Sequence, residues 1–424
     1  MLLVILVAMA DVYFISRLGT TSLAASALVF PFQTLMAGIA TGGMGGGVAS
    51  TLARALGAGR LDDARAIVRH ALILGIAIGF AFTAIAWTVA PSLYSAMGGD
   101  GLILKEAVMY SHVWFTGAVL FWTNTFMGSL LRGSGDAATP SRYAVVTLIA
   151  YVPLAGVLAL GVGAWAGLGL IGLPIASLAT TGGGCFLLAR SLLRSSLGLT
   201  SAVGIRLQGK PFVEILRVGA LGSFTTLTGS VTGVVMTGFV GGFGGAALAG
   251  YNIGARLEQM LPALAFGIGA SLTTLVGVAA GAGAWRRANK VAWTGALMAF
   301  SLIGVIGWTV ALLPEAWSRI FTTDAVVINA AAAYLTHVAP VYCLLGLGIA
   351  LNFAGQGAAR MAVPIAAGVS RMVVTIVGGW FAIRVGLGLG GVFTAIAAGI
   401  TVYGCYNSVA LLAAPWRAMR ATTA

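Results

Sequence analysis

Long apolar runs separated by short polar segments are the dominant pattern along the whole chain. Most runs extend for about 20 residues or more, the length at which a helix spans the hydrocarbon core of a bilayer. They lack the alternation of apolar and polar positions over about ten residues that is typical of a membrane β-barrel. We therefore predict an all-α polytopic membrane protein with twelve transmembrane helices, at residues 1–18, 23–53, 67–91, 106–131, 141–161, 169–193, 212–241, 247–280, 290–313, 327–354, 362–383 and 389–414.

Several short motifs near the start of the chain return, in the same order, about half a chain later. One match could arise by chance in a chain this rich in Gly and Ala, but a nearly constant offset indicates an internal duplication. The offset stays between 223 and 225 residues. The matching pairs are residues 19–25 (GTTSLAA) with 244–250 (GGAALAG), 51–52 with 274–275, and 57–59 (GAG) with 281–283 (GAG).

Two further matches extend the repeat over nearly the whole chain. They predict two homologous six-helix bundles around a central cavity, at residues 1–195 and 212–424, joined by a cytoplasmic linker at 196–211. Six spans in each copy give both copies the same orientation across the membrane. The further matches are Gly133, Gly135 and Pro140 with Gly355, Gly357 and Pro364, with two extra residues in the second copy, and residues 167–172 with 386–391.

The basic residues are distributed very unevenly between the two sides of this topology. Eighteen Lys and Arg residues fall on one side and four on the other, and the richer side of a membrane protein is normally the cytoplasmic one. Both termini are therefore predicted to be cytoplasmic, and the net charge of +13 requires no nucleic acid to explain it. The cytoplasmic set is Arg54, Arg60, Arg65, Arg69, Arg132, Arg142, Arg190, Arg194, Arg206, Lys210, Arg217, Arg286, Arg287, Lys290, Arg360, Arg371, Arg417 and Arg420.

No motif in the sequence points to an enzyme, a metal site or a bound cofactor. The chain has no GxxxxGK[ST] phosphate loop and no HExxH pair, so we expect no catalytic activity and no cofactor. Cys185, Cys343 and Cys405 all fall within apolar runs, which favours packing over a disulfide or a metal site. The first apolar run lacks a basic region and a small-residue cleavage site, so we expect no cleaved signal peptide.

Eight of the ten acidic residues lie in loops or at the ends of predicted spans, and the two that remain are Asp11 in the first span and Glu258 near the start of the eighth. An ionisable residue in a spanning helix is costly and usually faces a cavity with a functional role. A protonated carboxyl group is much cheaper to bury than a carboxylate, so we expect Asp11 to exchange a proton as the ion-coupling residue. Glu258 is a secondary candidate, and the nearby Arg256 favours an interfacial ion pair for it.

Some uncharged polar residues also lie within the predicted spans. Gln33 and Tyr151 are the stronger candidates for a supporting role because they belong to the same half as Asp11. Packing is the alternative role for both. His112 and His337 occupy nearly equivalent places in the two copies, where helix packing is favoured over a proton relay.

An ordered set of motifs covers nearly the whole chain and resembles the multidrug and toxic-compound extrusion (MATE) transporters. Among their branches, the chain is most similar to the bacterial one named after DNA-damage-inducible protein F (DinF). The motifs are residues 11–19 (DVYFISRLG), 23–25 (LAA), 31–33 (PFQ), 57–60 (GAGR), 131–136 (LRGSGD) and 167–169 (GLG).

The resemblance implies two lobes of six helices around a central cavity and export of organic compounds in exchange for protons or sodium. The membrane-embedded aspartate of the family's first helix falls on Asp11. Where many relatives carry an Asn and an Asp in the fifth helix, this chain has Tyr151 and Ala155, and Ser177 replaces a Thr of the sixth. We expect Gln33, Tyr151 and Ser177 to support Asp11 in the cavity. A lone carboxylate suits a proton better than a sodium cage of several oxygens.

The favoured function is a secondary transporter, monomeric in the bacterial plasma membrane, that exports cationic or amphipathic organic compounds by antiport with protons or sodium. The alternative is a lipid-linked oligosaccharide flippase of the same superfamily. Such a flippase is expected to line its cavity with several basic residues to meet a pyrophosphate, and the predicted spans are almost free of Lys and Arg. The repeated GAG motif and Asp11 argue against a major-facilitator-type carrier, and an intramembrane carboxylate argues against a passive scaffold.

Overall fold

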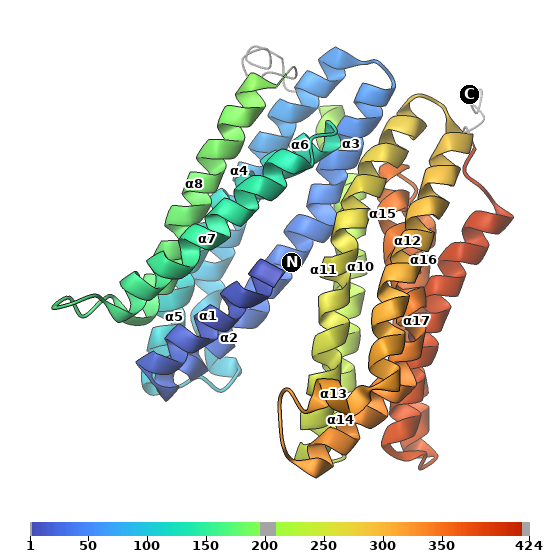
Figure 1. Ribbon diagram of the computed structural model, residues 1–424. Coiled ribbons are helices and arrows are strands. Elements are labelled where there is room, and N and C mark those ends of the chain that lie inside the picture. The colour runs from blue at the N-terminus through green and yellow to red at the C-terminus, as the bar shows by residue number, and fades with distance from the viewer. Residues whose placement is uncertain (1, 196–208, 418–424) are drawn as a thin grey trace. The chain divides into compact units, whose positions relative to one another are not determined.

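The computed structural model describes residues 2–195 and 209–417, and most of these residues lie in helices (Figure 1). The first half contains α1 (Leu2–Leu18), α2 (Thr20–Gly38), the π-helix η1 (Ile39–Met44), α3 (Gly45–Gly57), α4 (Leu61–Ala96), α5 (Gly101–Thr116), α6 (Ala118–Gly133), α7 (Ala138–Leu160), η2 (Gly169–Ile171) and α8 (Gly172–Arg194). The second half contains α10 (Gly209–Gly241), α11 (Gly245–Gly281), α12 (Trp285–Leu312), α13 (Pro314–Ser318), α14 (Ala325–Val338), η3 (Ala339–Val341), α15 (Tyr342–Gly357), α16 (Ala362–Arg384) and α17 (Gly388–Ala413).

The chain divides into two compact units. The first comprises Met1–Leu52 and Arg60–Leu216, and the second comprises Ala53–Gly59 and Arg217–Ala424. The end of α3 is therefore grouped with the second unit, and the first turns of α10 with the first. Most of the predicted linker, residues 196–211, lies outside the described residues.

Each predicted span coincides with one helix or with successive helices. Ten helical stretches in the described part of the chain are long and apolar enough to cross a membrane. The first predicted span is the 17-residue α1, and the fourth is the pair α5 and α6, interrupted at Gly117. The tenth span is made of α14 and α15 with η3 between them. The short α13 was not predicted from the sequence.

The same glycine conformations recur at helix boundaries of both halves. Gly19 (φ 117) precedes α2 and Gly244 (φ 102) precedes α11. Gly59 (φ 69) and Gly283 (φ 71) follow the C-termini of α3 and α11. Side chains disfavour these positive φ values, whereas glycine adopts them without strain. The motifs that reveal the duplication in the sequence therefore specify its turns.

The structure corrects the alignment of one repeated motif. α6 ends at Gly133 and α15 ends at Gly357, and the left-handed residues that follow are Gly135 (φ 98) and Ala359 (φ 54). Gly133 therefore corresponds to Gly357 and not to Gly355, so the predicted two-residue insertion is wrong. The match was hidden because an alanine occupies the left-handed position, which costs a non-glycine residue about 1 kcal/mol or more.

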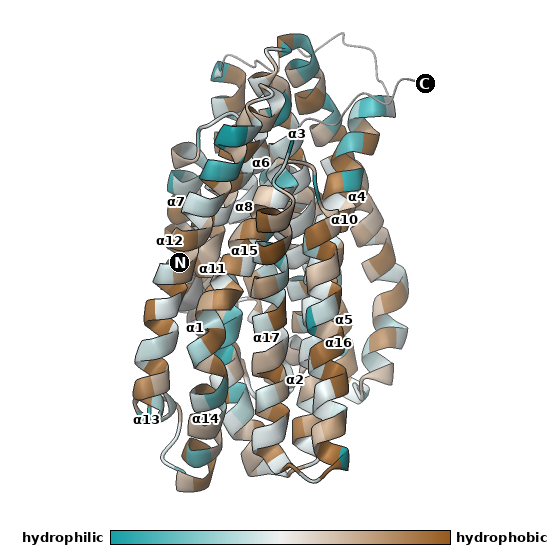
Figure 2. Cartoon of the chain, turned by 90° about the vertical axis from the view of Figure 1, so that its right-hand side faces the viewer, coloured by the Kyte–Doolittle hydropathy of each residue, from teal (hydrophilic) through white to brown (hydrophobic). Residues whose placement is uncertain are grey.

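Glycines within the helices allow close approach between neighbouring elements of one unit. A Cβ atom added to Gly133 would lie 2.7 Å from the backbone oxygen of Ala49, and one added to Gly269 would lie 2.3 Å from the ring of Phe353. Small residues play this role between membrane helices. Along the middle of the long helices the ribbon is mostly white to brown, with much of the teal near their ends (Figure 2), as expected for surfaces that face lipid.

Candidate functional site

The helices α1, α2, α5, α7 and α8 of the first unit line a cavity of about 420 Å³. Within this unit α1 packs against α7 and α2, α2 packs against α5, and α7 packs against α8. The volume falls in the range of about 300–1,000 Å³ that is usual for small-molecule sites. Polar side chains line much of the cavity, namely Asp11, Gln33, Thr34, Tyr110, Thr147, Tyr151, Ser177, Thr180 and Thr181.

Asp11 is the one charged residue that lines this cavity in the described part of the chain. The Tyr151 hydroxyl donates a hydrogen bond of 2.7 Å to Asp11 Oδ1 and so joins α7 to α1. Tyr151 itself is 8% exposed, which fixes its ring in the helix interface. No other described side chain hydrogen-bonds to this carboxylate. Oδ2 therefore remains available to a ligand in the cavity.

Two aromatic residues of α5 form part of the cavity wall. The Tyr110 hydroxyl accepts a hydrogen bond of 3.4 Å from Gln33 Nε2, which links α5 to α2. Trp114 lies one turn further along α5 and also lines the cavity. Neither residue stands out in the sequence, because an aromatic side chain in an apolar span is usually a packing residue. Their position relative to Asp11 becomes evident only in the folded unit.

The structure brings together all four residues predicted for the first half. Asp11, Gln33, Tyr151 and Ser177 line the same cavity, from α1, α2, α7 and α8 respectively. Ala155, one turn after Tyr151 on α7, is fully buried and offers no polar atom from its side chain. Among the described lining residues, the carboxylate of Asp11 therefore has hydroxyl and amide groups around it and no second carboxylate.

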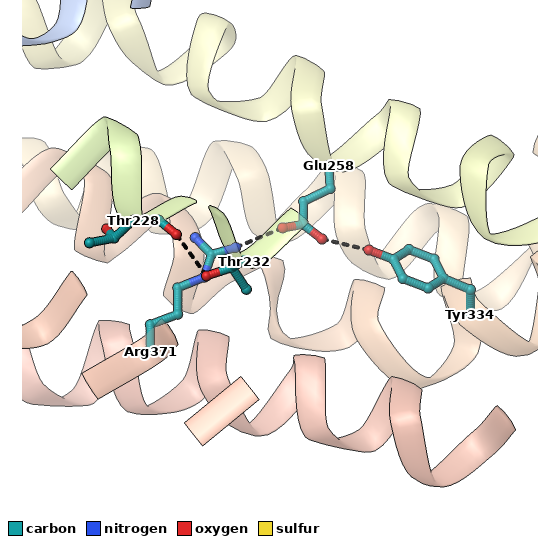
Figure 3. A network of polar contacts seen from close by, with 5 residues as sticks. All are labelled: Thr228, Thr232, Glu258, Tyr334 and Arg371. Atoms are coloured by element: carbon teal, nitrogen blue, oxygen red, sulfur yellow. Dashed lines mark hydrogen bonds and ion pairs between the residues drawn. The ribbon is translucent and has the colours of Figure 1, made fainter. Parts of the chain in front are cut away.

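Glu258 lies in the second unit, where it forms an ion pair with Arg371 (Figure 3). Arg371 Nη2 lies 2.7 Å from Glu258 Oε1, and the two side chains are 20% and 18% exposed. The Tyr334 hydroxyl donates a hydrogen bond to the other oxygen, Oε2. Both carboxylate oxygens are therefore occupied, and the cluster connects α11 with α14 and α16.

This cluster corrects two expectations. Arg256, the expected partner of Glu258, lies instead over the ring of Phe321, 5.8 Å from its centroid. The charge count assigned Arg371 to the cytoplasmic side, whereas it lies inside the spanning helix α16. One basic residue is therefore removed from the set of eighteen, which leaves the strong bias, and a half-buried arginine lies within a span.

The two polar clusters occupy equivalent places in the two halves. α5 and α14 begin at residues 101 and 325, and α7 and α16 begin at 138 and 362, an offset of 224 in both pairs. For α2 and α11, which begin at 20 and 245, the offset is 225. The matching residues are Gln33 with Glu258, Tyr110 with Tyr334, and Thr147 with Arg371. The second copy thus holds an ion pair where the first has two uncharged cavity residues.

The remaining candidates lie away from the cavity. His112 stacks on Trp87, with ring centroids 4.9 Å apart, and His337 Nδ1 lies 2.7 Å from the backbone oxygen of Ala333. Neither histidine lines the cavity. Cys185, Cys343 and Cys405 are free thiols. Within the described residues, no group of three or more His, Cys, Asp or Glu side chains could hold a metal ion.

Comparison with known proteins decides the family. The MatE family model matches residues 1–157 and 223–381, which is most of the chain. This chain belongs to the MATE family of transporters. It is 24% identical to an FAD transporter of Shewanella oneidensis, over 80% of this chain and 75% of that protein. It is 26% identical to the probable multidrug resistance protein NorM of Thermotoga maritima, over 79% of this chain and 71% of the relative.

Solved structures of MATE transporters share the fold. A transporter of the MOP superfamily from Pyrococcus furiosus superposes with a TM-score of 0.88 at 22% sequence identity, covering 96% of this chain and 91% of that chain. A MATE transporter in complex with MaD3S superposes with a TM-score of 0.89 at 23% identity, covering 97% and 93%. The predicted family and the predicted all-α membrane architecture are confirmed.

Proposed function

We propose that this MATE transporter exports cationic or amphipathic organic compounds by antiport with protons through alternating access. The observation that carries the proposal is the single carboxylate of Asp11, which lines a cavity large enough for a small molecule and has an oxygen free for a ligand. A charged group in this place is costly in a membrane. Exchange of its counter-charge during transport accounts for its presence.

The cavity is suited chemically to a cation with an apolar body. Asp11 supplies the only formal charge among the described lining residues, and this charge is negative whenever the carboxyl group carries no proton. Tyr110 and Trp114 supply aromatic surface that can attract a cationic group through its quadrupole. The hydroxyl groups of Thr147 and Ser177 supply neutral hydrogen-bond partners. An anionic substrate would meet repulsion from Asp11 in this cavity.

Competition at Asp11 gives a simple coupling mechanism. A proton neutralises the carboxyl group when no substrate is present, and a substrate cation takes over as counter-charge when it displaces the proton. Because linkage is reciprocal, a proton that weakens substrate binding is itself released when substrate binds. Because the site holds either a proton or a substrate, the two species cross the membrane in opposite directions, which is antiport.

A proton fits this site better than sodium. Sodium requires several oxygen ligands around it, and in the described lining Asp11 is the one anionic group among neutral hydroxyl and amide groups. No second carboxylate lines the cavity in the described residues. A proton needs only the free oxygen Oδ2. We therefore assign coupling to protons, with sodium as the alternative to be tested.

The flippase alternative has less support. A pyrophosphate-linked substrate would require basic residues in the cavity, and the described lining contains no Lys or Arg. Arg371, a basic residue inside a span of the second unit, is already paired with Glu258. We place the transporter in the bacterial plasma membrane, with both termini cytoplasmic, on the basis of the charge bias and the bacterial relatives, and we propose that it acts as a monomer.

Reconstituted vesicles under imposed gradients test this function. Purified transporter in liposomes would be supplied with ethidium as the cationic probe and with FAD as an anionic one, since one relative is named an FAD transporter. The proposal expects ethidium movement driven by a proton gradient and not by a sodium gradient, and no movement of FAD. Transport driven only by sodium would change the coupling ion, and transport of FAD alone would overturn the substrate class.

A further inference from the structure

The proposed exchange at Asp11 does not use the ion pair of the second unit, although this pair stands at positions equivalent to the cavity wall of the first. Glu258 and Arg371 stand at the positions that Gln33 and Thr147 occupy in the first unit. The tyrosine of each cluster is retained, as Tyr110 in one half and Tyr334 in the other. The two copies thus differ at these two positions, which are uncharged in the first unit and oppositely charged in the second.

The second cluster contains its own counter-charge. Tyr334 donates to one oxygen of Glu258, and the guanidinium of Arg371 contacts the other at 2.7 Å (Figure 3). Arg371 also lies over the ring of Tyr403, with its guanidinium carbon 5.8 Å from the ring centroid. Tyr334 and Tyr403 are 1% and 6% exposed, so both hold the pair from rigid, buried positions.

An unpaired charge inside the protein is costly, and the two carboxylates avoid this cost in different ways. A carboxylate that is largely removed from water requires a cation close to it, and removal of one partner from such a pair leaves an uncompensated charge. At Asp11, among the described residues, the cavity supplies no such cation, so the counter-charge must come from outside. At Glu258 the counter-charge is covalently attached to α16 and cannot leave the protein.

We propose that Arg371 is a specificity-determining residue, whose guanidinium acts as the permanent counter-cation of Glu258 and excludes other cations from this second copy of the cavity wall. Exchange of protons and of cationic substrate groups is thereby confined to Asp11. The inference rests on the proposed function in one respect, the exchange at Asp11. The exclusion at Glu258 is a binding property and can be measured without transport.

The test replaces residues of the second copy with those found at the equivalent positions of the first. Arg371→Thr places at this position the residue found at Thr147, and Glu258→Gln places the one found at Gln33. Binding of ²²Na⁺ to the purified full-length protein would be measured at alkaline pH, where a proton does not compete for an unpaired carboxylate, for wild type, Arg371→Thr, Arg371→Lys and the double variant Glu258→Gln/Arg371→Thr. We expect Arg371→Thr to gain saturable ²²Na⁺ binding. The double variant should lose it, and Arg371→Lys should behave as wild type because an ammonium group still supplies the charge.

Three outcomes would overturn the proposal: no added binding in folded Arg371→Thr, equal binding in Arg371→Thr and the double variant, or added binding in Arg371→Lys. If Arg371→Thr does not fold, wild type and Glu258→Gln decide the matter. The proposal then requires the same ²²Na⁺ binding in both, and a loss in Glu258→Gln contradicts it. Asp11 is intact in every protein compared. These binding results would therefore stand even if the proposed proton antiport at Asp11 proved wrong.

Discussion

At the residue scale, the two halves place a carboxylate in the membrane in different ways. Asp11 receives one hydrogen bond from Tyr151 and otherwise faces a cavity. Glu258 receives one from Tyr334 and is neutralised by Arg371. Each carboxylate therefore has a tyrosine hydroxyl, and the two sites differ in where the positive charge originates. Asp11 is therefore suited to exchange one counter-charge for another, whereas Glu258 is suited to a permanent ion pair.

Replacement of Asp11 by Asn should abolish gradient-driven export. The amide keeps the size of the side chain but cannot release a proton, so it imitates the proton-loaded state permanently. We expect ethidium efflux from proteoliposomes to fall to the level of empty liposomes, while folding and membrane insertion are retained. Glu258→Gln is the matched control and should lose stability, because Arg371 is left unpaired, but keep much more of its transport. Wild-type efflux by Asp11→Asn would refute the assignment.

Removal of the Tyr151 hydroxyl should weaken transport without destroying the fold. A hydrogen bond to a charged group contributes about 1.5–3 kcal/mol, so Tyr151→Phe should lower the efflux rate by about tenfold or more at a fixed proton gradient. Tyr143→Phe is a suitable control on the same helix, because it removes a hydroxyl that bonds to Ser191 at 3.1 Å and does not line the cavity. Equal effects of the two variants would deny Tyr151 a specific role.

At the element scale, close helix packing depends on particular glycines and not on glycine content. Gly269 and Gly267 lie two positions apart on α11, yet a Cβ at Gly269 would meet Phe353 at 2.3 Å and a Cβ at Gly267 would meet nothing within 4 Å. Gly269→Ala should therefore destabilise the protein by about 1–3 kcal/mol. Gly267→Ala should be neutral or slightly stabilising. Thermal unfolding in detergent measures both, and a similar loss in the two variants would contradict this packing.

The start of α7 depends on Asp136. Its Oδ1 accepts a hydrogen bond of 2.9 Å from the backbone N–H of Thr139, and bonds from the Thr139 hydroxyl and backbone hold the pKa of Asp136 below its usual value. Asp136→Ala should cost about 1 kcal/mol at neutral pH. A lowered pKa means that this stabilisation exists above the ordinary pKa of aspartate and disappears as the pH falls through the folded-state value.

A surface carboxylate serves as the control for Asp136. Asp62 pairs with Arg65, but its side chain is 95% exposed, and exposed ion pairs contribute about 0–1 kcal/mol. Asp62→Ala should therefore change the unfolding temperature less than Asp136→Ala. The reverse order would show that the hydrogen bond to Thr139 does not stabilise α7.

At the scale of the whole molecule, the sequence predicts features that depend on local patterns. Span positions follow from the length of apolar runs, and Asp11 stands out because a charge within such a run is costly wherever it points. The partner of Glu258 could not be found in this way, because Arg371 is 113 positions distant in the chain and was counted with the basic residues of the cytoplasmic side. Tyr110 and Trp114 look like packing residues until the helices of the unit are assembled.

The predicted orientation of the whole molecule in the membrane can be tested by chemical labelling. In a protein freed of its native cysteines, single cysteines at positions 60, 206 and 286 should react with a membrane-impermeant reagent only from the cytoplasmic side. The reason is the excess of Lys and Arg on that side of the predicted topology. Labelling of any of the three from outside intact cells contradicts the orientation.

The central claim is that proton and substrate compete for Asp11, and proton release on substrate binding tests it most directly. Ethidium would be added to the purified transporter in a weakly buffered solution, and a pH-sensitive dye would report the protons released, for wild type and for Asp11→Asn. The account predicts that wild type releases protons as ethidium saturates its site and that Asp11→Asn releases none. Saturable ethidium binding to wild type without proton release, or equal release by Asp11→Asn, would contradict it.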